Sequence, residues 1–210
     1  MDASKNTSRR GFLRSSAAVA GGALASRLTI GEVAYAAGSD VIRVGMIGCG
    51  GRNAGAGAQA LTADPGASLV AMCDIFVDRV KEKHRYLKEQ KPGQVVVDDD
   101  HFFAGFDGYK RVIESSDVVL IANAAKFHPL HAMTAIKAGK HVFVEKPHGI
   151  DPAGVKLMQQ AADLAKQKGL CIVSGLHSRH HPGYAETVQR IHDGAIGAVV
   201  AVEENFLRAP

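Results

Sequence analysis

The sequence Gly48-Cys49-Gly50-Gly51-Arg52-Asn53 follows directly on Val41–Ile47, a run rich in β-branched residues that predicts a strand. A helix of small residues is expected next, from about Asn53 to Ala63. The Asp64-Pro65-Gly66 turn ends that helix. The order strand, glycine-rich turn, helix is the context in which a glycine motif binds the diphosphate of a dinucleotide.

The glycines in this turn each have a physical task. Gly48 permits the tight turn, and Gly50 lets the backbone approach a pyrophosphate, while the start of the helix presents unpaired N–H groups to the phosphates. Asn53 departs from the usual fingerprint, because a third glycine normally allows the helix to pack closely on the strand there. Residues 54–58 are all alanine or glycine, so we expect the close packing to be kept but shifted slightly.

Asp74 supports the same interpretation. It closes the second expected strand, Ser68 to Cys73, and lies 26 residues after Gly48. A carboxylate there accepts hydrogen bonds from the adenosine ribose hydroxyls and repels a 2′-phosphate. The next residues, Ile75 and Phe76, offer no arginine for that phosphate. These observations favour cofactor binding over the alternative of a flexible turn and a solvated strand end, and NAD over NADP.

Strands and helices alternate along the rest of the chain. Further strands are expected at 95–97, 117–122, 141–145, 170–174 and 198–206, and further helices at about 78–89, 105–114, 128–138, 151–169 and 184–191. The helix at 151–169 has three boundary signals: Asp151 as N-cap, Pro152 at the first turn and Gly169 beyond the end. This alternation predicts an α/β fold with a Rossmann-type, doubly wound parallel sheet that has helices on both faces. The boundary of the sheet domain is expected between Glu145 and Asp151, or just after Ser174.

A second informative stretch is Gly139-Lys140-His141-Val142-Phe143-Val144-Glu145-Lys146-Pro147. The buried strand in it delivers Glu145 and Lys146 to the carboxyl edge of the sheet, where ligands of open α/β sheets bind. Pro147 restricts Lys146 to an extended conformation, which aims its side chain. An ammonium held near a nicotinamide can stabilise alkoxide character as a hydroxyl is oxidised. The alternative is a Glu-Lys pair that only solvates the turn.

The first 36 residues have the features of an export signal. Ser8–Arg14 contains two adjacent arginines, Ser15–Ala25 is short and apolar, and Ala34-Tyr35-Ala36 offers the small residues that signal peptidase needs. The arginine pair resembles the bacterial twin-arginine signal, which predicts a periplasmic or secreted protein. The alternative is an amphipathic first helix with a chance arginine pair.

Composition narrows the class of protein. Apolar residues make up 46% of the chain and charged residues 22%, the balance of a soluble globular protein. No apolar run approaches the roughly 20 residues that span a bilayer, so we expect no membrane association once the signal is removed. Most of the net charge of +4 comes from the first 36 residues, so nucleic-acid binding is not indicated.

The sequence indicates neither a disulfide framework nor a metal site. Three cysteines do not make a disulfide scaffold. His177, His180 and His181 form a histidine-rich patch, but no carboxylate or cysteine falls at metal-ligand spacing beside it. Substrate hydrogen bonding or plain solvated loop histidines are therefore favoured over a metal centre.

Three parts of the sequence resemble the glucose–fructose oxidoreductase/inositol dehydrogenase (Gfo/Idh/MocA) family: Gly48–Gly51, Asp74 and, above all, Gly139–Val142 leading into Glu145–Pro147. The resemblance covers about Val41 to Phe206. It implies an NAD(P)-binding Rossmann domain at 40–150, followed by an α/β substrate and oligomerisation domain. It also implies an NAD(P)-dependent oxidoreductase that transfers a hydride between the cofactor and a sugar or polyol, working as a homo-oligomer.

The resemblance also implies individual roles. Lys146 would be catalytic, touching both the substrate hydroxyl and the nicotinamide, and Glu145 would lie beside the nicotinamide ribose. Asn123 and His128 would lie on the loop that passes the cofactor, although 121–125 departs from the family's usual Ala-Thr-Pro. Arg179 and His180 would join Lys146 at the substrate. The cofactor-binding residues expected are Gly48, Cys49, Gly50, Gly51, Arg52, Asn53, Asp74, Asn123, His128, Glu145 and Lys146.

Family members are considerably longer, and their catalytic histidine lies beyond the point that matches Pro210. We therefore expect 151–210 to hold a crossover helix, a strand and the start of a truncated second domain. Three functions remain open at this stage: the sugar or polyol oxidoreductase, an NAD-dependent, redox-neutral glycoside hydrolase of the same family, and a cofactor-binding fragment without activity.

Overall fold

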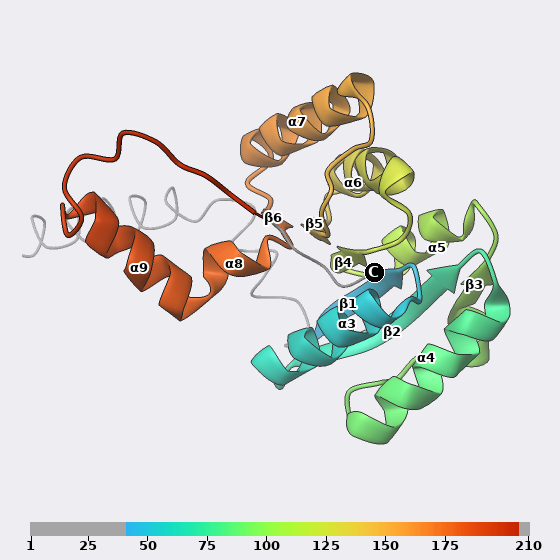
Figure 1. The fold of residues 1–210 in the computed structure, drawn as a ribbon. Coiled ribbons are helices and arrows are strands. Elements are labelled where there is room, and N and C mark those ends of the chain that lie inside the picture. The colour runs from blue at the N-terminus through green and yellow to red at the C-terminus, as the bar shows by residue number, and fades with distance from the viewer. Residues whose placement is uncertain (1–40, 206–210) are drawn as a thin grey trace, which may run out of the picture. The chain divides into compact units, whose positions relative to one another are not determined.

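A computed structural model describes residues 41–205 of the 210-residue chain, so the expected export signal at 1–36 lies outside the described residues. The described strands form one parallel sheet with the order β3-β2-β1-β4-β5-β6 (Figure 1). The strands are β1 (Ile42–Ile47), β2 (Ala67–Asp74), β3 (Phe102–Ala104), β4 (Val118–Ile121), β5 (His141–Val144) and β6 (Ile172–Ser174).

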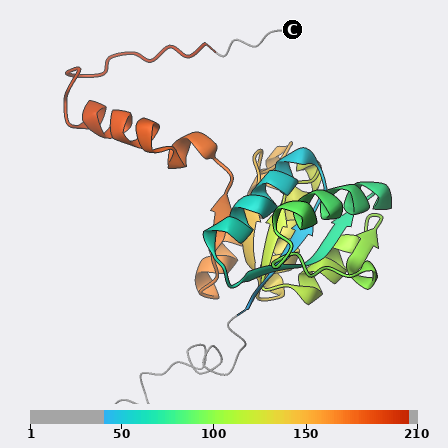
Figure 2. The same cartoon turned by 90° about the horizontal axis from the view of Figure 1, so that it is seen from below.

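Helices cover both faces of this sheet (Figures 1 and 2). The helices are α3 (Gly51–Ala63), α4 (Val77–Gln90), α5 (Gly108–Ser115), α6 (His128–Lys137), α7 (Pro152–Gln167), α8 (His177–His180) and α9 (Pro182–His192). α3 and α4 pack on one face, and α5, α6 and α7 on the other, each with its own apolar core. The predicted Rossmann-type, doubly wound α/β fold is confirmed.

The strand order reverses at β1, and this creates the place where a ligand can bind. β2 lies on one side of β1 and β4 on the other, and the chain leaves β1 toward α3 on one face of the sheet. The connections at the carboxyl ends of β1 and β4 therefore diverge. In open α/β sheets, the crevice at such a switch point is the usual ligand site.

The helix after β5 begins and ends at the residues that the sequence indicates. The Asp151 carboxylate accepts a hydrogen bond from the Gly154 N–H at 2.6 Å, which caps the first turn of α7, and Pro152 occupies the first helical position. Gly169 follows the end of the helix with a φ of +67°, a left-handed conformation that favours glycine.

Two predicted strands are wrong. Val95 makes only a single bridge to Leu69, and the edge strand is β3 instead, after a short 3-10 turn at Asp99–His101. Val95 and Val97 are buried beside α4, so their apolar character serves the core rather than a strand. The strand expected at 198–206 is absent from residues 198–205, whose valines are exposed. A strand needs a neighbour for its N–H and C=O groups, and none of the described strands lies beside this segment.

β6 pairs with β5 through Val142–Ile172, Phe143–Val173 and Val144–Ser174, so α7 and β6 belong to the same sheet layer as the strands before them. The sheet thus extends to Ser174. The predicted helix around Tyr184–Ile191 is present as α9, and none of its residues is buried. Among the described residues, no helix has the length and apolar character needed to cross a membrane.

Candidate cofactor and active site

The loop after β1 leaves open space where the sequence predicts phosphate binding. Gly48 has a φ of +91°, and a Cβ built on it would lie 2.7 Å from the Cα of Asn123, so only glycine fits there. Gly50 and Gly51 differ, because a Cβ on either would meet nothing within 4 Å. Gly48 thus lets two loops of the protein approach each other, while Gly50 and Gly51 expose backbone at the start of α3.

Asn53 is fully buried beneath this loop. Its Nδ2 lies 3.1 Å from the carbonyl oxygen of Ile47, 2.8 Å from that of Gly48 and 3.1 Å from that of Leu120. The asparagine therefore ties α3 to both β1 and β4 where a third glycine was expected. The close approach of helix to strand occurs one turn later, at Gly57, where a Cβ would lie 2.9 Å from the Met46 sulfur.

Asp74 is held in place by the backbone around it. Oδ2 accepts a hydrogen bond from the Cys49 N–H at 2.7 Å, and Oδ1 accepts one from the Phe76 N–H at 3.2 Å. Cys49 and Cys73 are both buried beside this carboxylate as free cysteines. Burial raises the pKa of both thiols, that of Cys73 to about 12, so neither is a nucleophile at neutral pH.

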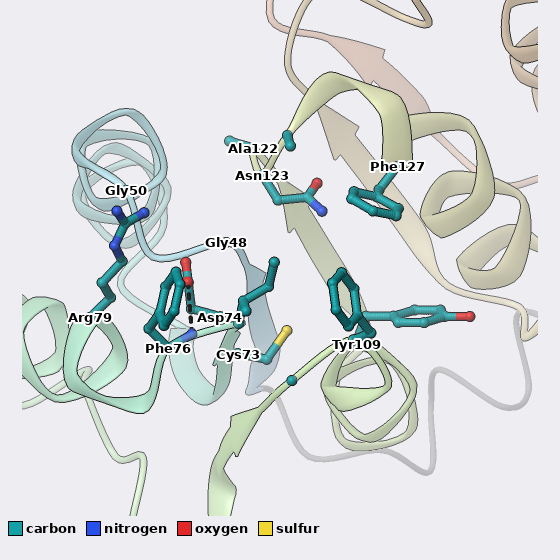
Figure 3. A pocket seen from close by; sticks show the side chains of 14 residues that line it. Gly48, Gly50, Cys73, Asp74, Phe76, Arg79, Tyr109, Ala122, Asn123 and Phe127 are labelled. Atoms are coloured by element: carbon teal, nitrogen blue, oxygen red, sulfur yellow. Dashed lines mark hydrogen bonds between the residues drawn. The ribbon is translucent and has the colours of Figure 1, made fainter.

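A cavity of about 220 Å³ opens between Asp74 and the loop after β4 (Figure 3). Asp74, Phe76 and Arg79 stand on one side of it, and Asn123 and Phe127 on the other. We call it the Asp74 cavity. A carboxylate beside aromatic surface suits a ribose and the adenine attached to it.

A second cavity of about 600 Å³ lies at the carboxyl end of β5, and we call it the Lys146 cavity. It is lined by Arg52, Gln59, Ala122, Asn123, His128, Glu145, Lys146, Gly175 and His177. Ala122 and Asn123 line both cavities, so the two meet at the loop after β4. The Asn123 Oδ1 is buried and has no hydrogen-bond partner among the described residues, an oxygen that a bound ligand can satisfy.

Glu145 is fixed at the wall of the Lys146 cavity. Its side chain is 6% exposed, and its Oε1 accepts a hydrogen bond from the Arg52 Nε at 2.6 Å. Its Oε2 accepts one from the Lys146 N–H at 3.2 Å. Gly175 packs against the carboxylate so closely that a Cβ there would collide with Oε1. The Lys146 side chain itself is exposed at the cavity.

His128 joins the two loops that border the Lys146 cavity. It is 1% exposed, with Nδ1 lying 2.8 Å from the carbonyl oxygen of Pro147 and Nε2 3.0 Å from that of Asn123. The Asn123 Nδ2 is 3.2 Å from the Nδ1 of His131, whose ring stacks on Tyr109 at 4.1 Å between centroids. Burial, with a smaller effect of His128, lowers the pKa of His131 to about 4.

Most of the residues expected at the site lie together. Gly48, Gly50, Asp74 and Asn123 line the Asp74 cavity, and Arg52, His128, Glu145 and Lys146 line the Lys146 cavity. The expected residues that line neither cavity are Gly51, the buried Cys49 and Asn53, and Arg179 and His180, which are exposed on α8. His177, the first residue of α8, lines the Lys146 cavity in their place.

Arg79 is the functional candidate that sequence reasoning missed. It lies five positions after Asp74 and lines the same cavity, although neither of the two residues next to Asp74 is an arginine. The helical turn that begins α4 at Val77 brings Arg79 back toward the strand end, and this was available as a signal.

Residues 42–175 match the GFO_IDH_MocA family model, described as an oxidoreductase family with an NAD-binding Rossmann fold. A dTDP-3,4-didehydro-2,6-dideoxy-alpha-D-glucose 3-reductase from Actinomadura kijaniata is 28% identical over 177 residues, covering 83% of this chain and 48% of that protein. A Glycosyl hydrolase family 109 protein from Bacteroides fragilis is 34% identical over 110 residues, covering 51% of this chain and 23% of that protein.

The fold is also similar to solved structures. A mutant of a 3-ketoreductase from Actinomadura kijaniata, crystallised with TDP-benzene and NADP, superposes with a TM-score of 0.57 at 27% identity. The match covers 76% of this chain and 44% of that one. The chain therefore spans about half the length of the reductase relative and of this structure.

Proposed function

The chain belongs to the GFO_IDH_MocA family of oxidoreductases with an NAD-binding Rossmann fold, and we propose that the whole protein transfers a hydride between a nicotinamide dinucleotide and a sugar or polyol. The observation that carries this proposal is the pair of cavities that meet at Asn123. One has the Asp74 carboxylate on its wall, and the other has Lys146. A dinucleotide has two halves joined by a diphosphate, and the exposed backbone of Gly50 lies at the start of α3.

The residues present fit such a cofactor. Asp74 would hold the adenosine ribose, and the N–H groups at the start of α3 would hold the diphosphate. The unpartnered Oδ1 of Asn123 would accept a hydrogen bond between the two cavities. Asp74 supports NAD as the cofactor, while the NADP bound in the solved ketoreductase supports NADP. The shared fit is to a nicotinamide dinucleotide.

Lys146 and Glu145 are the residues of this chain that would act on the substrate and the cofactor. A bound nicotinamide dinucleotide would supply the hydride acceptor or donor. The Lys146 ammonium, free to reach into its cavity, would hydrogen-bond the substrate oxygen whose charge changes during the reaction. Glu145, held by Arg52 and Gly175, would keep a fixed negative charge beside it. His177 would add a further hydrogen-bonding group on the substrate side.

We also propose the class of substrate. The relative named as a dTDP-sugar 3-reductase supports a carbohydrate-like small molecule, with Lys146, Arg179 and His180 as the sequence-based candidates for contacting it. The family resemblance supports a homo-oligomer for the whole protein. The twin-arginine pattern at 8–14 supports export to the periplasm or beyond, and replacing both Arg9 and Arg10 by lysine should block that export in a cell-fractionation assay.

The experiment that tests the function is a comparison of Lys146→Ala with Lys156→Ala. Lys156 is exposed on α7 and lines neither cavity, so it is a matched control. We expect Lys146→Ala to abolish reduction of NAD(P) by sugars while the affinity for the dinucleotide changes by no more than a few fold. Calorimetry on the folded chain measures the affinity. The proposal fails if neither NAD nor NADP binds.

A redox-neutral glycoside hydrolase is the second candidate, favoured by the relatives of Glycosyl hydrolase family 109. It would use the same cofactor residues, because a sugar would be oxidised transiently and then reduced again. Parallel assays of nicotinamide absorbance and of aglycone release separate the two. Net reduction of the nicotinamide identifies the oxidoreductase, whereas release of the aglycone without it identifies the hydrolase.

A further inference from the structure

We propose that His131 is a positioning residue: by accepting a hydrogen bond from the Asn123 amide, it keeps the Asn123 Oδ1 available, where the two cavities meet, for a donor group on the nicotinamide half of the cofactor. This proposal rests on the proposed function, because it concerns how the same dinucleotide is held. His131 itself lines neither cavity, so it would act only through Asn123.

The first observation is the direction of the hydrogen bond between the two side chains. The Asn123 Nδ2 lies 3.2 Å from the His131 Nδ1. An amide nitrogen only donates, so Nδ1 accepts, and the neutral ring carries its proton on Nε2. Burial lowers the pKa of His131 to about 4, which keeps the imidazole neutral and its Nδ1 able to accept at neutral pH.

The second observation is that its neighbours hold the His131 ring. The residue is 6% exposed, and its ring stacks on Tyr109 with 4.1 Å between centroids. The Phe127 ring lies nearly parallel to it, at 5.9 Å and an interplanar angle of 12°. Figure 3 shows Tyr109 and Phe127 on the same side of the Asp74 cavity as Asn123. A ring fixed by packing can in turn fix the orientation of the amide that is bonded to it.

The third observation is the state in which this leaves Asn123. Its Oδ1 is buried and has no hydrogen-bond partner among residues 41–205. An acceptor in that state is unfavourable, and an amide free to rotate would turn to pair it. While the His131 Nδ1 carries no proton, turning the amide would bring two acceptors together and lose the donor. The unpaired oxygen is therefore held ready for a ligand, which lowers the cost of binding.

The place of this oxygen indicates which part of a dinucleotide it would contact. Asn123 lines both cavities, and Asp74 stands on the other side of the Asp74 cavity, where it would hold the adenosine ribose. The diphosphate offers only acceptors, which an amide oxygen repels. The ribose hydroxyls and the carboxamide of the nicotinamide half are donors, so this half suits the Asn123 Oδ1 best.

The test measures the affinity of the full chain for the reduced cofactor, NADH or NADPH, by its fluorescence, and for ADP by calorimetry. ADP has the adenosine and a diphosphate but no nicotinamide half. Asn123→Ala removes the acceptor itself. His131→Phe keeps a ring beside Tyr109 and removes the Nδ1 acceptor, whereas His131→Asn puts an amide oxygen in the place of Nδ1 and removes the ring.

His84→Phe is the matched control. His84 is a half-buried histidine on α4 that lines neither cavity, and its ring packs edge-on against Phe102 at 4.9 Å. The substitution reports any general effect of exchanging a packed imidazole for a phenyl ring. It should leave both affinities within about twofold of the unaltered chain, because the two sites are independent.

We expect Asn123→Ala to weaken the reduced cofactor by about tenfold, through the loss of one hydrogen bond, and His131→Phe to weaken it by about fivefold. The double variant should lose no more than Asn123→Ala alone, whereas independent effects would multiply to about fiftyfold. His131→Asn should bind within about twofold of the unaltered chain, although it should unfold in less urea than His131→Phe, because it restores the acceptor but not the stacked ring. ADP should stay within about twofold in every variant.

Several results would overturn the proposal while leaving the cofactor function intact. An unchanged affinity in Asn123→Ala or His131→Phe would show that this hydrogen bond does not serve the cofactor. Losses that multiply in the double variant would show that His131 acts independently of Asn123. Weaker binding of ADP, or affinities that follow stability across the two His131 variants, would assign His131 a structural role only. Failure of the unaltered chain to bind NADH and NADPH would instead overturn the proposed function itself.

Discussion

Arg52 and Glu145, which are 93 positions apart in the sequence, form an ion pair of 2.6 Å between Nε and Oε1 across the mouth of the Lys146 cavity. The pair joins the first turn of α3 to the end of β5. The glutamate side chain is 6% exposed and the arginine side chain 49%. A buried carboxylate thus depends on a cation that stands half in solvent, beside the predicted diphosphate site.

We expect the coupling within this pair to exceed that of an exposed pair. A double-mutant cycle of Arg52→Met and Glu145→Gln, followed by chemical denaturation, should give a coupling energy of about 1–3 kcal/mol, because removing Arg52 leaves the buried Glu145 carboxylate without its cation. Arg190 and Glu186 on α9 also lie 2.7 Å apart but are 72% and 61% exposed, which makes them a matched control. Their coupling should stay near 0.5 kcal/mol or less. Equal couplings for the two pairs would contradict the burial argument.

Asn53 gives a second prediction, on stability. Asn53→Ala removes a donor from a site with three carbonyl oxygens and should lower the free energy of unfolding by about 1–3 kcal/mol. Asn53→Asp should cost more than Asn53→Ala, because an anionic oxygen would replace the donor and face the same carbonyls. Urea denaturation of both variants measures this order. A more stable aspartate variant would show that the Nδ2 contacts do not hold the loop.

Short-range sequence signals were sufficient to predict much of the fold. β-branched runs, the glycine turn and the signals at Asp151, Pro152 and Gly169 are interactions between near neighbours in the chain, and these elements were predicted correctly. The family resemblance was confirmed over residues 42–175. The roles of Lys146 and Asp74 in the candidate site stay predictions, although both residues line the cavities.

Two of the failures involve partners that are distant in the sequence. Val95 and Val97 have the composition of a strand, but β2 takes its edge neighbour from Phe102–Ala104. The donor role of Asn53 depends on a carbonyl of β4, 67 positions away. Spacing alone could not rank these alternatives, since each depends on which residues the tertiary fold brings together. Arg79 is different, because it lies only five positions after Asp74 and reaches the cavity through the local turn that begins α4.

Gly175 gives a third prediction, which tests how tightly Glu145 is positioned. Gly175→Ala places a Cβ against the Glu145 carboxylate and should lower the free energy of unfolding by about 1–3 kcal/mol. Gly93→Ala, where a Cβ would meet nothing within 4 Å, is the control and should be nearly neutral. In a Glu145→Ala background the cost of Gly175→Ala should largely disappear. A cost that persists there would assign the effect to the backbone rather than to the carboxylate.

His131 gives a prediction on pH, since burial lowers the pKa of its imidazole from 6.5 to about 4. Between these values the unfolded chain binds the proton and the folded chain does not, so His131 contributes stability above pH 6.5 that is lost as the pH falls toward 4. The shift corresponds to about 3 kcal/mol at most.

His131→Phe keeps an aromatic ring beside Tyr109 but cannot take up a proton. The difference in free energy of unfolding between the two proteins should therefore change in favour of the phenylalanine variant as the pH falls from 7 to 5, measured by urea denaturation at each pH. A difference that is constant over this range would show that His131 titrates alike in the folded and unfolded chains.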